Sequence, residues 1–428
     1  MRHTLPLALV CGLATTVAAQ DGAPAPAERG GESAMMIDDG LIGVSGSIIS
    51  ISDRGVVLID EAGRRVSRAL SDLTALLITR APVRAADGIG AAPPPDSDDT
   101  SGVERILRRL RATPAGVLET VDGQRFPGAF STTAGQDDAI VWTHPTFGTL
   151  IFPLDDVAAA FRDMEEARRM PEASAAPLDD VLVLTNGDRL RGFVVGLGDP
   201  VEIEVDGQVL TIEPARVSAA ILSNPRRSRA GDMVWLEDGT VALIDRFALT
   251  EAGVVTVALP DGHSGEYESS SLRALALGVE RLVPLSMLVP IEQSPVGGRR
   301  TAEPIQHVPN IEDTLTSGAP ALGAMDVRMP GPMKIVYDLP PGARRLAMSA
   351  MLGDDAGQWG DCELVISIDG RELTRAHLWK DEPVHAINID ASGKRLTIAL
   401  EPGRFGPIRD SALLARPIIL VDRATPRD

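Results

Sequence analysis

Alternating apolar and polar residues run through most of this chain and predict short β-strands. The clearest example is VEIEVDGQVLTI, residues 201–212, in which valine or isoleucine alternates with glutamate. Period-two alternation is typical of a strand with one buried face and one wet face. Asp206-Gly207 separates the two apolar runs and predicts a hairpin that places Ile203 opposite Leu210.

A second hairpin is predicted just before this one, in VLVLTNGDRLRGFVV, residues 181–195. Asn-Gly between two apolar runs is among the strongest short-range hairpin signals. A two-residue turn at Asn186-Gly187 places Val183 opposite Leu190.

The same plan of strand, glycine turn, strand, second hairpin and closing apolar stretch recurs in four segments. They are residues 37–79, 117–162, 180–224 and 231–278. In the second and third segments, Gly128 and Gly192 follow the turn at the same offset, which suits a sharp bend in a long strand. The first and fourth segments show no glycine at that offset.

Units of about 45 residues suggest either a propeller or small barrels that resemble SH3-like or Sm-like folds. The linkers between the units are unequal, and no Gly-His…Trp-Asp signature is present. These features favour tandem small barrels.

The chain changes character at about residue 282. Short strands continue to residue 422, with hairpins about Asp369-Gly370 and Ser392-Gly393. Six to eight antiparallel strands in this stretch predict a β-sandwich or jelly roll. The expected fold class is therefore mainly β, with tandem small β-barrel units followed by a C-terminal jelly-roll β-sandwich.

The remaining segments read as a leader and linkers. A short basic start, an apolar run and a small-residue site at Val17-Ala18-Ala19 predict a signal peptide over residues 1–19. Residues 20–36 form a linker rich in alanine and proline, and residues 80–116 form a linker with a short helix. A further helix is expected at the end of the second unit, which then spans residues 117–170.

Composition limits the partners. The chain has 60 acidic against 41 basic residues, which disfavours nucleic acid because that binding depends on Lys and Arg at phosphates. Of two cysteines, Cys11 lies in the predicted signal peptide, so Cys362 has no partner for an internal disulfide. We expect a periplasmic or extracellular protein without a transmembrane segment after signal removal, and without a cofactor.

A series of short motifs in the last domain resembles, in its order, the NPCBM family of carbohydrate-binding modules found beside glycoside hydrolase family 98. The motifs are IVYDL at 335–339, LGDD at 352–355, VISIDGREL at 365–373, INID at 387–390, LTI at 396–398 and DSALLARP at 410–417. The resemblance covers residues 282–422 and implies a jelly-roll sandwich with a glycan-binding role. The chain departs from the family at Leu414, where the family usually has tryptophan.

Sugar sites combine flat aromatic rings with polar groups that hold hydroxyls. Two tryptophans of the last domain lie among polar residues near predicted loops, and charged residues lie close to them in sequence. The predicted ligand-binding residues are Trp359, Trp379, Asp354, Asp355, Asp361 and Lys380. Two alternatives remain: both indoles could be packing residues, and Asp354-Asp355 could hold a structural calcium.

Three functions follow. The first is an exported, non-catalytic protein that binds a glycan or polysaccharide through the C-terminal sandwich. The second is an envelope or extracellular assembly protein without sugar binding, which Leu414 and the 3% aromatic content favour. The third is a glycosidase with paired carboxylates, for which the small β units leave no segment large enough for a catalytic barrel.

Overall fold

The chain folds mainly into antiparallel β-sheets, as predicted. The computed structural model describes residues 33–52, 55–60, 62–78, 116–130, 138–163, 178–249, 253–296, 303–308, 322, 324–353, 360–379, 384–406 and 410–422. These residues contain short 3₁₀ turns but no α-helix, and hence no helix that could cross a membrane. Internal contacts divide the chain into two compact units, Met1–Pro82 with Ala276–Asp428, and Val83–Leu275. The predicted signal peptide and linker helices lie outside the described residues.

The first repeat, in the first compact unit, consists of five strands. Its strands are β1 (Ser33–Asp38), β2 (Gly43–Ser52), β3 (Gly55–Asp60), β4 (Arg65–Arg68) and β5 (Leu73–Ile78). The first four pair in sequence order, and β5 returns to pair with β1. A 3₁₀ turn, Leu70–Asp72, precedes β5. Every residue of β5 is buried, which agrees with a sequence that is apolar at every position except Thr74.

The second compact unit repeats this strand order. One set of strands is β6 (Gly116–Thr120), β7 (Arg125–Phe130), β8 (Ala139–His144), β9 (Gly148–Pro153) and β10 (Val157–Phe161). The next is β11 (Asp180–Leu184), β12 (Arg189–Leu197), β13 (Val201–Val205), β14 (Gln208–Ile212) and β15 (Val217–Ile221). In each set the last strand pairs with the first. The two sets join through β10 and β15, which pair with each other.

The fourth repeat differs by a broken second strand. It comprises β16 (Asp232–Leu236), β17 (Val241–Ile244), β18 (Arg246–Leu249), β19 (Val254–Ala258), β20 (Ser264–Glu268) and β21 (Leu272–Ala276). β21 pairs with β16, as the last strand does elsewhere. In none of the four repeats does a described pairing connect the fourth strand to the fifth, so the described strands form no closed barrel.

The first hairpin of the third repeat has a different register from the one predicted. Leu182, not Val183, lies opposite Leu190. The N–H of Leu184 donates to the carbonyl of Asp188 and that of Gly187 to Leu184, which closes a three-residue loop over 185–187. Gly187 takes φ 89° as its last residue, an arrangement with a glycine bulge that shifts the register by one. The pairing of Ile203 with Leu210 is confirmed.

The bend glycine is present in three repeats rather than two. A Cβ on Gly128 would lie 2.3 Å from the carbonyl oxygen of Thr143, and one on Gly192 would lie 2.1 Å from that of Glu204. Gly46 in β2 makes the same approach, 2.1 Å from the oxygen of Ile59. The sequence comparison missed Gly46 because the positive-φ residue of that turn is Leu41, one position beyond Gly40.

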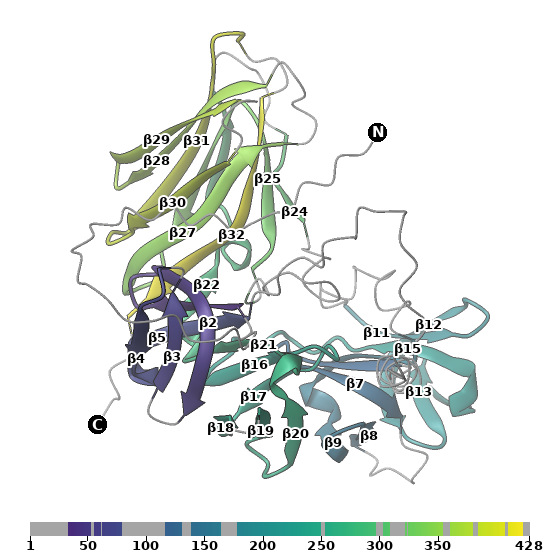
Figure 1. Cartoon of the computed structure of the whole chain (residues 1–428). Helices are drawn as coiled ribbons and strands as arrows, with labels where there is room; N and C mark the ends of the chain where they lie inside the picture. The colour runs from purple at the N-terminus through teal and green to yellow at the C-terminus, as the bar shows by residue number, and fades with distance from the viewer. Residues whose placement is uncertain are drawn as a thin grey trace, which may run out of the picture. The chain divides into compact units, whose positions relative to one another are not determined.

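Two sheets of the first compact unit pack on one apolar core and make a sandwich-like module, drawn in yellow and light green in Figure 1. One sheet orders β24 (Gln306–Val308), β25 (Asp326–Pro330), β32 (Ser411–Val421), β27 (Ala343–Leu352) and β30 (Val384–Asp390), with β22 (Leu282–Pro284) on β32. The other orders β23 (Glu292–Pro295), β26 (Met333–Asp338), β31 (Arg395–Pro402), β28 (Asp361–Ile368) and β29 (Arg371–Trp379). Tyr337, Leu346, Ile366 and Leu414 are among the side chains buried between them.

Candidate functional site

The candidate site lies where β28 begins and β29 ends, at the edge of the sandwich sheet that orders β23, β26, β31, β28 and β29. Asp361, the first residue of β28, pairs in register with Trp379, the last residue of β29. Cys362 and Leu378, one position further in, are fully buried in the core. Because side chains alternate across a strand, Asp361, His377 and Trp379 share the outer face of the sheet.

Asp361 is the polar centre of this cluster. Its carboxylate is buried, and Oδ1 lies 2.5 Å from Nε2 of His377. Oδ2 lies 3.0 Å from Nε of Arg404, in the turn that follows β31. The carboxylate therefore orients two side chains that remain about half exposed or more, His377 at 46% and Arg404 at 68%. Ion pairs and hydrogen bonds to a buried carboxylate restrict the geometry of both partners.

Aromatic rings surround this polar centre. The imidazole of His377 and the indole of Trp379 are parallel within 2°, with ring centroids 5.9 Å apart. The guanidinium of Arg404 lies 4.5 Å from the ring centroid of Phe405, which is 40% exposed. Trp379 is only partly buried, whereas Trp142 and Trp235 are core residues. The arrangement presents flat apolar rings beside charged donors at the surface.

Gly403 brings the turn that carries Arg404 and Phe405 against β28. Its N–H donates to the carbonyl of Asp361 at 2.9 Å, and a Cβ at this position would meet that oxygen at 2.1 Å. A residue without a side chain is needed for such an approach. The sequence EPGRFG thus places an arginine and a phenylalanine beside Asp361 by means of its first glycine.

A second charged cluster continues along the same outer face. Nη1 of Arg375 lies 2.7 Å from Glu401, and its Nη2 lies 3.0 Å from Glu372. These bonds raise the pKa of Arg375 and lower that of Glu372.

On the opposite face of the sheet, burial and the neighbouring carboxylates raise the pKa of the Cys362 thiol to about 12. A thiol with such a pKa is unreactive at neutral pH, so Cys362 acts here as a core residue.

The structure brings two of the predicted site residues together, Asp361 and Trp379. The other four, Asp354, Asp355, Trp359 and Lys380, lie outside the described residues. The sequence reasoning missed three members of the cluster. His377 is not among the predicted site residues, although its alternation with Trp379 places both on one face. Arg404 reaches Asp361, and Phe405 contacts Arg404, only through the turn after β31.

The Leu414 position is part of the core and not of this site. Leu414 is fully buried between the two sheets. Leu414 therefore contributes to the packing of the core and not to the surface cluster. Among the described residues, no group of three His, Cys, Asp or Glu side chains could hold a metal ion. A calcium site at Asp354-Asp355 falls outside the described part of the chain.

No family model and no curated protein matches the sequence. Among solved structures, the chain is similar to the CBM51 module of Clostridium perfringens GH95 in complex with methyl-galactose. The match has 12% identity and a TM-score of 0.26, and covers 32% of this chain and 99% of that module.

A second match is to the CBM51-2 and INT domains of Clostridium perfringens ZmpB, with GlcNAc bound. It has 12% identity and a TM-score of 0.27, and covers 44% of this chain and 43% of that one. The M60 catalytic domain of ZmpB with both CBM51 domains matches over 88% of this chain and 42% of its own length, with 11% identity and a TM-score of 0.26. These values describe a distant structural similarity to CBM51 carbohydrate-binding β-sandwich modules.

Proposed function

We propose that this chain is an exported, non-catalytic protein that binds a glycan through the edge of its C-terminal sandwich. The observation that carries the proposal is the surface cluster in which Asp361 contacts both His377, which stacks on Trp379, and Arg404. The proposal includes a periplasmic or extracellular location, which rests on the predicted signal peptide.

The cluster has the chemistry that sugar recognition requires. The C–H faces of a pyranose pack on flat rings, and its hydroxyls need donors and acceptors whose positions are fixed. Trp379 supplies a partly exposed flat ring, while Arg404 supplies guanidinium N–H donors. Since Nε2 of His377 faces the carboxylate, Nδ1 of the same ring remains for a ligand hydroxyl. Orientation by a buried carboxylate lowers the entropic cost of ordering these side chains on binding.

A glycan array probed with the full-length protein tests the proposal. We expect Trp379→Ala to lower affinity about two- to tenfold, the equivalent of the roughly 0.5–1.5 kcal/mol of an aromatic contact. Arg404→Ala should also weaken binding. The matched control is Phe193→Ala, which removes an exposed aromatic ring from the second compact unit and should bind glycan as the parent does. Absence of glycan binding by the parent protein would falsify the proposal.

The proposal also includes the detailed folds of the C-terminal sandwich and of the N-terminal repeats. The order of motifs in residues 282–422 supports an NPCBM-like jelly roll, and the shared strand order with a 3₁₀ turn before the last strand supports SH3-like or Sm-like repeats. The absence of catalysis is tested by reducing-sugar release from the glycans that the array identifies. Release above background would show a glycosidase instead.

A second candidate function is assembly with another envelope or extracellular protein. Phe193 and Val209 are 65% and 54% exposed, and both lie opposite Glu204 across the β12–β13–β14 ladder. β14 also has no described pairing on its outer edge. An exposed apolar pair beside a free strand edge favours a protein partner. A cross-linking experiment that depends on Phe193 but not on Trp379 would support this candidate.

A further inference from the structure

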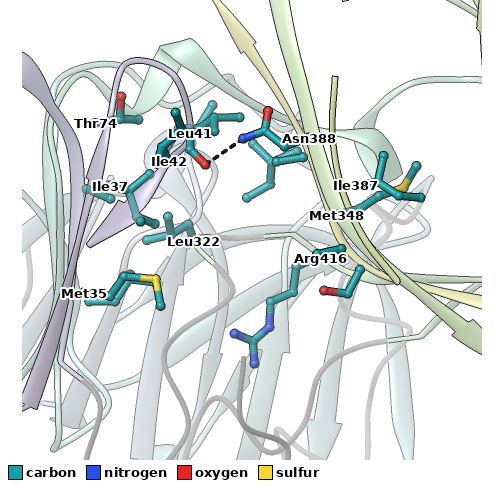
Figure 2. Close-up of a pocket in the computed structure, with 18 of the residues that line it drawn as sticks. Met35, Ile37, Leu41, Ile42, Thr74, Leu322, Met348, Ile387, Asn388 and Arg416 are labelled. Atoms are coloured by element: carbon teal, nitrogen blue, oxygen red, sulfur yellow. Dashed lines mark hydrogen bonds between the residues drawn. The ribbon is translucent and has the colours of Figure 1, made fainter. Parts of the chain in front are cut away.

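A cavity of about 310 Å³ lies within the first compact unit, away from the Trp379 cluster. Met35 and Ile37 from β1, with Leu41 and Ile42 from the turn that follows it, line one side of it (Figure 2). The opposite side is the sandwich, which contributes both large and small side chains. The large ones include Met348, Ile387 and Arg416, and the small ones are Ala347, Ser349, Ala386 and Ala415. Ile42 is 44% exposed, which shows that the cavity opens to solvent.

Backbone strain is concentrated at this cavity. Five non-glycine residues in the described part of the chain have positive φ. Two of them, Asp206 and Asp369, precede a glycine in tight turns where such angles are ordinary. The remaining three are Leu41 at 55°, Leu322 at 51° and Arg416 at 49°, and all three line the cavity. Strain of this kind costs about 1–3 kcal/mol per residue and is characteristic of functional sites.

Leu41 occupies a turn position that the other three repeats fill with glycine. Gly123, Gly187 and Gly239 occupy the corresponding position in the other three repeats, each with positive φ. The first repeat has leucine there, and its side chain lines the cavity. Nδ2 of Asn388 donates to the carbonyl oxygen of Leu41 at 3.1 Å, a bond drawn in Figure 2. This hydrogen bond holds the strained backbone of Leu41 in position at the wall of the cavity.

The lining indicates the chemistry of the occupant. Protein interiors contain few voids larger than a water molecule, whereas sites for small molecules are mainly apolar and measure hundreds of cubic ångströms. None of the described lining residues is aromatic, so the cavity lacks the flat surface on which a sugar packs. Aliphatic side chains and the thioether of Met35 suit a flexible hydrocarbon. We propose that this cavity is a binding site for a small aliphatic molecule.

Methyl NMR of the full-length protein, labelled with ¹³C at its methionine methyl groups, tests this proposal with 1-decanol as the probe. We expect a saturable shift of the Met35 methyl resonance, assigned through Met35→Leu. The methyl groups of Met329 and Met333, buried in the sandwich core, should not respond. The absence of a saturable response at Met35, or an equal response at all three, would overturn the proposal.

Two variants distinguish decanol binding in the cavity from non-specific binding to other apolar surface. Ala347→Phe should fill the cavity and weaken decanol binding at least tenfold, whereas the matched control Ala248→Phe, on the exposed face of β18, should leave it unchanged. Leu41→Gly should raise the melting temperature because it relieves the strain, and should weaken decanol binding. This second variant decides the matter if Ala347→Phe does not fold. If Ala347→Phe or Leu41→Gly folds and binds decanol with the parent's affinity, the proposal is overturned.

Discussion

Burial without a neighbouring counter-charge lowers the pKa of His144 to about 4. Its Nε2 lies 2.9 Å from Oγ1 of Thr240, and Nδ1 accepts the backbone N–H groups of Thr146 and Phe147 at 3.1 Å each. A proton on Nδ1 would break both of these bonds.

The pH dependence of stability follows from this depressed pKa. Between pH 6.5 and about 4 the unfolded chain binds a proton at this histidine and the folded chain does not. The contribution of His144 is therefore complete above pH 6.5 and falls with pH by up to about 1.4 kcal/mol per unit. Denaturant unfolding at several pH values should show a shallower slope for His144→Gln than for the parent. The partly exposed control His263→Gln should keep the parent's slope, and equal slopes in all three would contradict the prediction.

Leu414 makes a second prediction at the scale of one residue. The side chain is fully buried against both sheets, so an indole there exceeds the available volume. We expect Leu414→Trp to lower the free energy of unfolding by about 1–3 kcal/mol, the usual cost of overpacking. Denaturant titration measures the effect. A stabilised variant with improved glycan affinity would show instead that this position serves the site.

At the scale of the element, two glycines of one hairpin serve different purposes. Gly187 has φ 89° and open space around its Cα, so Gly187→Ala should cost about 1–2 kcal/mol, the price of the left-handed conformation. Gly192→Ala should cost more, because its Cβ would lie 2.1 Å from the backbone oxygen of Glu204 and β12 must separate from β13. Thermal unfolding of the two variants compares the costs, and the reverse order would contradict the close approach.

At the scale of the whole molecule, an ion pair joins segments 242 positions apart in sequence. Nη1 of Arg281 lies 2.9 Å from Oδ1 of Asp39, which also accepts the hydroxyl of Thr74 at 3.0 Å. Arg281 is 2% exposed and Asp39 is 41% exposed. The pair therefore connects the first repeat to the segment that leads into the sandwich, within one compact unit.

This difference in burial predicts an asymmetric response to mutation. Asp39→Ala leaves a buried cation without its carboxylate, for which a loss of about 3–5 kcal/mol is typical. Arg281→Met leaves a carboxylate that water can reach and an apolar side chain in the buried position, so the loss should be smaller. Denaturant unfolding of both variants gives the comparison. A larger loss for Arg281→Met would show that the packing of the arginine stem matters more than the charge.

Local signals in the chain were sufficient to predict the strand content and the recurrence of the hairpin unit. They were also sufficient to predict that Glu202 and Glu204 alternate with buried residues. These features depend on side-chain period and turn residues, which act over a few positions. The register at Asn186-Gly187 was wrong because two-residue and three-residue loops share the same dipeptide. Gly46 was missed because Leu41 occupies a position where φ favours glycine.

The candidate sites show where local signals end. Trp379 and Asp361 could be proposed from their polar surroundings, but Arg404 joins them only when β31 pairs with β28 and Gly403 contacts Asp361. The cavity beside Leu41 depends on strands that are more than 300 positions apart. Side-chain period and turn chemistry are properties of neighbouring residues and can be read along the chain. Which distant side chains meet is decided by sheet pairing and packing, because these contacts form only when the separate strands are assembled.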